Sequence, residues 1–314
     1  DILIGAHDWL GELVTSGIIA SIDLGAKESE FTEAALAAFN YEGELYGMPY
    51  AVENVAFFYN PDLVPEPPAT WDEVREISEE LQSSGEAQYG FIRQEGDPYH
   101  FFPIQSAFGG YVFGTDSDGA YDPDEVGIDD EGSIESAIWL EEMVDEGLVP
   151  GGMDYDTYHS LFETGEAAMI ITGPWALDRI EESGVNYEIT SIPGGGQPFV
   201  GVQGFMVSAF SENQALATAF LTEFAATADV MFEIFELGGR TPAHLGALEL
   251  VTDERLVAFG EVGLEGRPMP AIPEMNAVWD AWGDAVTLIM QEQVGGEEAF
   301  ENAADQIRTT IAGE

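Results

Sequence analysis

Hydrophobic positions form two kinds of pattern along this chain: apolar runs and stripes with helical spacing. Apolar runs at residues 2–4 and 167–172, and a run at 199–207 that glycines interrupt, predict strands. The run at 167–172 has no polar alternation, which predicts a strand buried on both faces. Between such runs, apolar residues recur every three or four positions, which predicts amphipathic helices beginning near residues 10, 71, 134, 214 and 298.

Local capping signals mark where some of these helices begin. Thr70 followed by Glu73 has the spacing of a capping box, and so does Ser211 followed by Gln214. Asp8 stands directly before an apolar helical stripe and is predicted to cap it. We therefore expect three helix starts to be fixed by side-chain oxygens.

The alternation of strands and helices favours an α/β architecture with mostly parallel sheets. A chain of 314 residues has the length of about two domains. In open α/β sheets, ligands gather at the carboxyl ends of the strands. Two such domains would offer a cleft for a ligand.

The net charge of the chain excludes some kinds of binding partner. Eight Lys and Arg residues against 60 Asp and Glu residues give a net charge of −52. Binding to nucleic acid or to an anionic lipid surface requires clustered positive charge, so both are excluded as partners. Molar salt screens repulsion between exposed carboxylates. The composition therefore predicts adaptation to a hypersaline solvent, in which most acidic side chains are simply a hydrated surface.

Two carboxylates differ from that background by their position. Asp8 follows a predicted strand, so it could cap a helix, accept hydroxyl groups at a cleft edge, or do both. Glu53 ends the apolar run 48–52, where a lone charge is rarely buried without a partner. We expect Glu53 to face a cleft. The pair could also serve a glycosidase, although the sequence does not define their separation.

Aromatic residues form a second group of candidates. Trp9, Tyr99, Trp175 and Trp279 stand at predicted turns or helix starts rather than in periodic core stripes. Any one of them could simply be part of a core. Several such rings facing a cleft would suit sugars, because the apolar face of a pyranose packs on an aromatic ring.

Motifs for metal or covalent chemistry are weak. The chain has no cysteine, and its four histidines lack the spacing of zinc ligands, so no metal site and no cofactor are expected. Residues 116–119 with Glu125 resemble half of a calcium loop, but Gly114 occupies the place of the first ligand. Neither a phosphate-binding loop nor a serine nucleophile elbow occurs.

Several segments, in order along the whole chain, resemble the maltose/maltodextrin-binding proteins of ABC importers. They are residues 1–8 (DILIGAHD), 48–53 (MPYAVE), 59–65 (YNPDLVP), 67–73 (PPATWDE), 165–169 (GEAAM), 173–175 (GPW), 198–202 (PFVGV), 269–270 (MP) and 272–273 (IP). Two of them, YNPD and GEAAM, are shared by sugar receptors more broadly.

The resemblance implies a two-lobed periplasmic-binding-protein fold of type II, with mixed, mostly parallel sheets flanked by helices. Lobe 1 would comprise residues 1–52 and 203–250, and lobe 2 residues 53–202 and 251–314. The hinge would lie near 51–56 and 199–205. The first strand–helix–strand of lobe 1 in that family has no counterpart here, and we expect that it lies outside this sequence.

The resemblance also implies a set of ligand-binding positions. They are Ala6, Asp8, Trp9, Glu53, Asp97, Tyr99, Trp175, Met269 and Trp279. Gly5 stands where the maltose receptors carry a tryptophan and Trp9 where they carry an arginine, so a stacking ring has moved four residues along. Asp280 and Gly283 also depart from the family pattern, so the identity of the sugar is less well defined than the family.

The expected function is a non-enzymatic, monomeric, extracellular receptor that closes on an oligosaccharide and delivers it to membrane permease subunits. An N-terminal anchor outside this sequence would tether it to the outer face of the membrane. Alternatives are a receptor of the same class for another oligosaccharide or for iron, and a glycosidase that uses Asp8 and Glu53.

Overall fold

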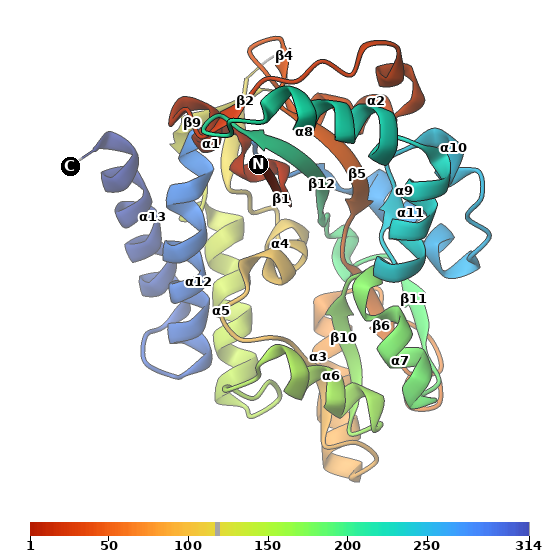
Figure 1. Cartoon of the computed structure of the whole chain (residues 1–314). Helices are drawn as coiled ribbons and strands as arrows, with labels where there is room; N and C mark the ends of the chain where they lie inside the picture. The colour runs from red at the N-terminus through yellow and green to blue at the C-terminus, as the bar shows by residue number, and fades with distance from the viewer. Residues whose placement is uncertain (117–119, 314) are drawn as a thin grey trace. The chain divides into compact units, whose positions relative to one another are not determined.

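The computed structural model describes residues 1–116 and 120–313, apart from the side chain of Glu254, and the chain forms two compact units. Unit 1 contains Asp1–Asn54, Val200–Val257 and Pro268–Asn276. Unit 2 contains Val55–Phe199, Ala258–Arg267 and Ala277–Glu314. Each unit is built from segments that are far apart in the sequence (Figure 1).

Unit 1 is organised around the long strand β12 (Phe199–Ser208). β12 pairs antiparallel with β1 (Ile2–Ala6) on one side and with β5 (Gly47–Glu53) on the other. β13 (Thr241–Pro242) continues the sheet beyond β5, and β2 (Ile19–Ala20) pairs with the far end of β12. The sheet therefore brings distant parts of the sequence side by side.

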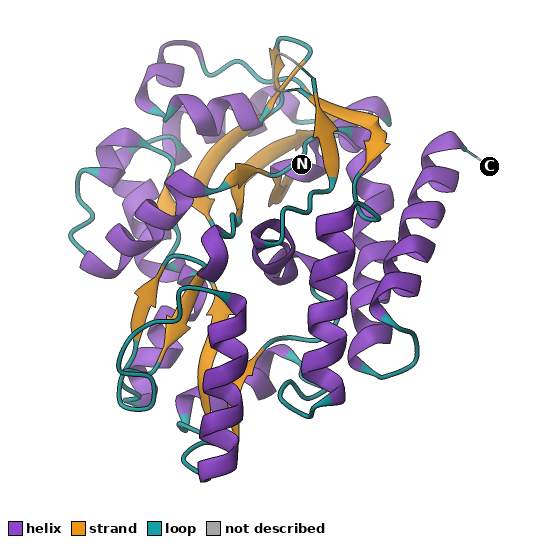
Figure 2. Ribbon diagram, turned by 180° about the vertical axis from the view of Figure 1, so that it is seen from behind, coloured by secondary structure: helices purple, strands orange, loops and turns teal. Residues whose placement is uncertain are grey.

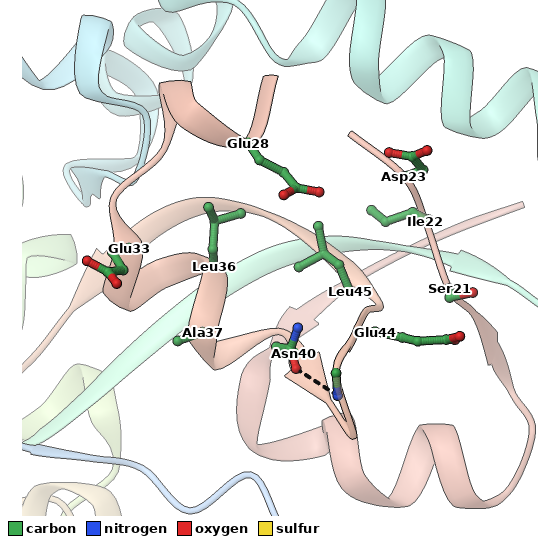
Figure 3. Close-up of a pocket in the computed structure, with 11 residues that line it drawn as sticks. Ser21, Ile22, Asp23, Glu28, Glu33, Leu36, Ala37, Asn40, Glu44 and Leu45 are labelled. Atoms are coloured by element: carbon green, nitrogen blue, oxygen red, sulfur yellow. Dashed lines mark hydrogen bonds between the residues drawn. The ribbon is translucent and has the colours of Figure 1, made fainter. Parts of the chain in front are cut away.

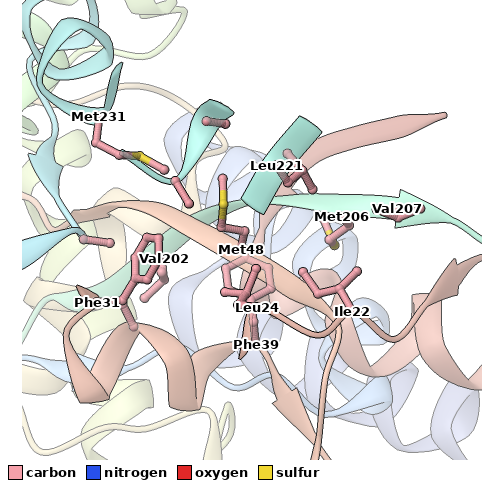
Figure 4. Packing of buried hydrophobic residues seen from close by; sticks show 14 of the residues in the cluster. Ile22, Leu24, Phe31, Phe39, Met48, Val202, Met206, Val207, Leu221 and Met231 are labelled. Atoms are coloured by element: carbon pink, nitrogen blue, oxygen red, sulfur yellow. The ribbon is translucent and has the colours of Figure 1, made fainter. Parts of the chain in front are cut away.

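Hydrophobic side chains from both sides of β12 form the core of unit 1 (Figure 4). Phe39 is fully buried, and its ring lies where Cβ atoms at Gly47 and Gly204 would come within 2.3 and 2.4 Å of it. Any larger side chain at these two glycines would displace Phe39. Met48 and Met206 are also fully buried in this cluster.

Unit 2 contains a four-stranded sheet in the order β11–β6–β10–β7. Strands are drawn in orange in Figure 2. The inner strand β10 (Ala167–Thr172) of this sheet is buried along its whole length, which confirms the prediction from its unbroken apolar run. β10 is parallel to β7 (Tyr89–Ile92) and antiparallel to β6 (Ala56–Tyr59). Helix α3 (Trp71–Ser84) packs against β7, and α6 (Tyr155–Glu163) packs against β10.

The described elements have the following bounds. Besides those given above, the strands are β3 (Asn40–Tyr41), β4 (Glu44–Leu45), β8 (Phe113–Thr115), β9 (Tyr121–Val126), β11 (Glu188–Thr190) and β14 (Arg267–Pro268). The remaining α-helices are α1 (Leu10–Thr15), α2 (Glu33–Ala38), α4 (Pro98–Ala107), α5 (Glu131–Asp145), α7 (Leu177–Ser183), α8 (Gln214–Phe220), α9 (Ala228–Gly238), α10 (Leu245–Leu248), α11 (Glu254–Glu265), α12 (Asn276–Met290) and α13 (Gly296–Ala312).

The expectation of mostly parallel sheets is wrong. Among the strand pairings described, β10 with β7 is parallel and the pairings of β1, β5 and β12 are antiparallel. The prediction assumed that each strand is followed by a helix that returns the chain in the same direction. β12 instead enters its sheet after the long segment Val55–Phe199 and can run opposite to both neighbours.

One of the three predicted caps is present. The Thr70 hydroxyl accepts a hydrogen bond from the Glu73 backbone N–H at 3.2 Å, as predicted. The Ser211 prediction is wrong, because α8 begins after Asn213 without a side-chain cap. The Asp8 prediction is also wrong, because Asp8 lies inside a 3₁₀ turn (His7–Trp9) that continues into α1.

The two units divide the chain differently from the predicted lobes near the C-terminal end. Pro268–Asn276, which carries Met269, belongs to unit 1, whereas the predicted lobe 2 included it. A backbone hydrogen bond of 3.1 Å from Gly11 N–H to the Ala271 carbonyl joins this segment to the first residues of unit 1.

Within the described part of the chain, no single helix has the length and apolar character needed to cross a bilayer. The segments Gln214–Ala225 and Ala228–Gly238 reach that length and character only when taken together, and the chain bends by 85° between them.

His7 links three segments of unit 1 through a buried neutral imidazole. Its Nδ1 accepts the Val202 backbone N–H at 3.0 Å, and its Nε2 lies 3.0 Å from the Met269 carbonyl oxygen. Burial lowers the pKa of His7 to about 4, although the bonds to Met269 and Val202 oppose this. A neutral ring with its proton on Nε2 satisfies both partners.

This burial predicts a pH-dependent contribution to stability. Between about pH 6.5 and 4 the unfolded chain binds a proton at His7 that the folded chain does not, so the free energy of unfolding falls as the pH falls. His7→Gln keeps one acceptor and one donor but removes the titration. In the variant we expect the slope of the free energy of unfolding against pH to be smaller by up to about 1.4 kcal/mol per pH unit.

Urea unfolding of both proteins between pH 4 and 7 measures the difference directly, since the carboxylates titrate alike in both. Parallel pH profiles for the two proteins would contradict the role assigned to His7.

Candidate functional site

Unit 2 contains a continuous array of aromatic rings that includes three predicted binding residues. Tyr99 lies 6.4 Å from Trp175 and 6.5 Å from Phe199, measured between ring centroids. Phe199 in turn lies 6.2 Å from Trp279. The structure therefore brings Tyr99, Trp175 and Trp279 into one cluster, joined by a ring that the sequence analysis did not select.

Burial divides this array into a floor and an exposed layer. Phe102 and Phe199 stack in parallel at 3.7 Å and are almost fully buried, and Trp282 is fully buried beneath Trp279. Tyr99, Trp175 and Trp279 are only partly buried. Partly exposed rings on a rigid aromatic floor provide an apolar surface of fixed shape for a ligand.

Local backbone geometry positions the Trp175 ring. Trp175 follows the buried end of β10, where Gly173 and Pro174 end the strand and begin a 3₁₀ turn (Pro174–Ala176). A Cβ atom at Gly173 would lie 2.2 Å from the Trp175 ring, so the indole lies directly against the glycine backbone. His159 Nδ1 donates to the Tyr155 carbonyl oxygen at 2.8 Å, so Nε2 of the neutral ring accepts the Thr172 hydroxyl at 2.9 Å and holds the end of β10.

Asp97 is held by its own neighbours instead of standing free. One of its oxygens accepts the His100 backbone N–H at 3.2 Å and the other lies 2.7 Å from His100 Nδ1. The fully buried Arg93 donates to the Asp97 carbonyl oxygen at 2.8 Å. Burial opposes ionisation of Asp97, but the charge and hydrogen bonds of His100, together with Arg93, lower its pKa to about 2.

The His100 ring connects Asp97 to the aromatic array. It lies edge-on to Tyr99 at 5.7 Å and to Trp175 at 5.9 Å. Asp97 thus caps α4, orients His100, and through that ring supports the two exposed aromatics. These contacts give Asp97 a structural role, and its role in binding a sugar stays a prediction from the resemblance.

The predicted residues at the start of unit 1 lie at the end of β1. Ala6 ends the strand, Asp8 is buried, and Trp9 is 46% exposed. A Cβ atom at Gly5 would lie 2.2 Å from the Trp9 ring, so this ring covers the place that a side chain at position 5 would occupy. The absence of a side chain at Gly5 and the presence of a ring at Trp9 are therefore structurally linked.

Glu53 is 8% exposed at the end of β5 and has a partner on each carboxylate oxygen. Gln203 of β12 donates to Oε1 at 2.8 Å, and the Arg240 Nε donates to Oε2. Burial raises the pKa of the nearby Tyr50, with Arg240 and Glu53 acting in opposite directions. Glu53 is therefore a partnered carboxylate, which agrees with the rule that a buried charge requires one.

Met269 is buried, and its backbone forms two hydrogen bonds. Its carbonyl oxygen faces His7, and its N–H donates to the Val200 carbonyl at 3.2 Å. Met269 is 5% exposed, and its place in a ligand groove stays a prediction from the resemblance.

A pocket of about 780 Å³ in unit 1 contains none of the predicted residues (Figure 3). Apolar side chains of Ile22, Leu36 and Leu45 line it together with the carboxylates of Asp23, Glu28, Glu33 and Glu44. Among the described residues, no group of acidic and histidine side chains is arranged to hold a metal ion. Residues 117–119 of the candidate calcium loop lie outside the described residues.

Besides the buried rings Phe102 and Phe199, sequence reasoning missed four polar or charged residues that organise these sites: Arg93, His100, Gln203 and Arg240. A cationic side chain within an apolar stretch, such as Arg93 after the run 89–92, was a usable signal in a chain with only eight cations. The partnership of Gln203 and Arg240 with Glu53 had no such signal, because 150 and 187 residues separate them from it.

Comparison with known proteins places the chain in a family. Residues 1–258 match the model of the bacterial extracellular solute-binding proteins. This chain belongs to that family. The match covers most of the chain.

Similar proteins bear names that refer to oligosaccharides. A galactooligosaccharide-binding protein of Bacillus subtilis is 30% identical, over 99% of this chain and 77% of that protein. A maltotriose-binding protein of Pyrococcus abyssi is 28% identical, and the match covers 93% of this chain but less than two thirds, 66%, of that protein. A maltooligosaccharide ABC transporter solute-binding lipoprotein of Streptococcus pneumoniae is 25% identical, over 99% and 76%.

These family members are solute-binding proteins and not enzymes. The glycosidase interpretation of Asp8 and Glu53 has no support among them. The aromatic array and the partnered carboxylates are accordingly parts of a binding protein.

The contacts of Asp97 lead to a prediction on stability. Asp97→Ala removes the α4 cap and leaves the buried Arg93 without its nearby carboxylate, so we expect the free energy of unfolding to fall by at least about 2 kcal/mol. Chemical denaturation measures the change.

Asp154→Ala provides the matched control, because Asp154 caps α6 through Thr157 N–H at 2.8 Å but has no buried arginine beside it. We expect a clearly smaller loss in this control. Equal losses in the two variants would show that Asp97 acts only as a helix cap.

Proposed function

We propose that this chain is the sugar-binding receptor of an ABC importer and that it binds a neutral oligosaccharide of the maltodextrin type. The observation that carries the proposal is the array of Tyr99, Trp175 and Trp279 in unit 2, whose rings are partly exposed above buried aromatic neighbours. Family membership and the names of its relatives support the same class of ligand.

Physical chemistry supports the match between rings and sugars. A pyranose has one face of C–H groups, which packs on an aromatic ring and buries apolar area at about 25 cal/mol per Å². Its hydroxyl groups need acceptors, and carboxylates form charge-assisted hydrogen bonds of about 1.5–3 kcal/mol each. Ordering of the ligand and of the chain offsets much of this, so a dissociation constant in the micromolar range, about −8 kcal/mol, is expected.

In this proposal unit 1 supplies the acceptors. Asp8 and Glu53 are carboxylates near strand ends, and Trp9 adds a ring that is nearly half exposed. In the same proposal the chain flexes near 51–56 and 199–205 when the ligand binds. Water removed from such a site strengthens the remaining hydrogen bonds.

A galactooligosaccharide is the second candidate. A relative of that name is 30% identical to this chain, and Trp9 over Gly5 offers a ring in a different place from that of the maltose receptors. A displaced ring selects for a different stacking face of the sugar. Iron and covalent sugar chemistry find no comparable support.

The proposal includes delivery of the bound sugar to membrane permease subunits and action as a monomer outside the cell. The family is extracellular, and two relatives from Streptococcus pneumoniae are named lipoproteins. A lipid anchor on this protein is likewise part of the proposal.

Isothermal titration calorimetry with maltotriose and with a galactose trisaccharide tests the ligand class. The buffer contains molar KCl, because the charge of −52 predicts the need for screening. We expect saturable heat with one bound ligand per chain for at least one sugar. No heat and no thermal shift with any neutral oligosaccharide would refute the proposal.

Trp175→Ala removes one partly exposed ring of the array. We expect at least a tenfold loss of affinity for the preferred sugar, about 1.4 kcal/mol, because the stacking surface is lost. Phe210→Ala serves as the control, since Phe210 is 77% exposed and belongs to unit 1 outside the array. Unchanged affinity in Trp175→Ala would remove this ring from the site.

A further inference from the structure

The carboxylate of Glu53 is more tightly constrained than a simple hydroxyl acceptor needs to be. It is almost buried, and each of its oxygens has a separate partner: Gln203 on Oε1 at 2.8 Å and Arg240 on Oε2. The partners come from opposite sides of β5. Gln203 belongs to β12 on one side, and Arg240 directly precedes β13 on the other.

The sheet itself sets this arrangement. Gln203 pairs with Ala51, two residues before Glu53, which places the two side chains on a diagonal that long side chains can span. Thr241 pairs with Val52, so the preceding Arg240 lies beside the end of β5. Changes in the Glu53 rotamer are opposed from both directions.

Arg240 also reaches beyond Glu53. Its side chain is 32% exposed and lines a pocket of about 210 Å³ with Tyr50, Ile234, Phe235 and Leu237. The guanidinium thus joins a buried carboxylate to a pocket open to solvent. Positive charge is scarce in this chain, which makes its position here informative.

We propose that Arg240 is the residue that determines the charge selectivity of the sugar site. It orients Glu53 together with Gln203, and it compensates the charge of Glu53 so that this part of unit 1 accepts neutral hydroxyl groups in preference to ammonium groups. The inference rests on the proposed function and specifies the ligand class of the same site: neutral sugars are bound, and cationic amino sugars are discriminated against.

The chemistry follows from the lone pairs of the carboxylate. Two carboxylate oxygens offer about four acceptor positions, and Arg240 and Gln203 each use one. The remaining positions can accept sugar hydroxyls in a defined direction. Without Arg240 the buried charge would be uncompensated, so a ligand ammonium group would become the better partner.

The experiment measures affinity for two ligands of equal length, maltotriose and the fully deacetylated glucosamine trisaccharide, at mildly acidic pH in molar KCl. Arg240→Met removes the charge and keeps the apolar stem. We expect its affinity for maltotriose to fall at least tenfold and the ratio of the two affinities to shift at least tenfold towards the amino sugar. Arg240→Lys, which keeps the charge, is expected to retain the selectivity of the natural sequence.

Arg75→Met is the matched control. Arg75 pairs with Glu142 and Glu146 in unit 2, so its loss changes the net charge by the same amount without touching Glu53. A shift of selectivity in Arg75→Met equal to that in Arg240→Met would attribute the effect to overall charge and overturn the inference.

The outcomes separate this inference from the proposed function. Maltotriose binding by the natural sequence with unchanged selectivity in Arg240→Met would overturn the role of Arg240 and leave the receptor intact. If the natural sequence does not bind maltotriose or other neutral trisaccharides, both the role of Arg240 and the proposed receptor function are overturned. If Arg240→Met fails to fold, Arg240→Gln replaces it, because it keeps a donor without the charge and is expected to show the same shift; an unchanged ratio there overturns the inference.

Discussion

Compensation of buried negative charge is the constraint on which both candidate sites depend. The chain has 60 acidic residues and eight Lys and Arg side chains, so most carboxylates must remain hydrated at the surface. Two of the eight cations lie beside carboxylates of the candidate sites, Arg93 near Asp97 and Arg240 on Glu53. A carboxylate can be held in a defined orientation away from water only where such a partner is available.

The aromatic array is rigid because its rings rest on closely packed, buried neighbours. Phe102 and Phe199 stack at 3.7 Å out of contact with solvent, so Tyr99 and Trp279 rest on neighbours that cannot move easily. His100, oriented by Asp97, lies edge-on to Tyr99 and Trp175. Charge pairing and ring packing are therefore coupled in unit 2, and a preorganised surface loses less entropy when a ligand binds.

Sequence patterns predicted elements well where local physics decides them. The apolar run 167–172 is a fully buried strand, and the Thr70 cap is present. Both predictions depend only on residues that lie within a few positions of one another in the sequence. Patterns failed where a distant segment decides. Asp8 lies within a 3₁₀ turn rather than at a helix cap, and β12 runs antiparallel to its neighbours because it enters the sheet from another part of the chain.

The sequence by itself determined the class of the protein: family membership, the acidic surface and the aromatic candidates Tyr99, Trp175 and Trp279 are all present in the order of residues. Only the tertiary structure decided what each candidate touches. It places the Glu53 carboxylate between Gln203 and Arg240. The physical reason is that contacts across a sheet depend on strand register, which joins residues 150 or more positions apart and leaves no periodic trace in the sequence.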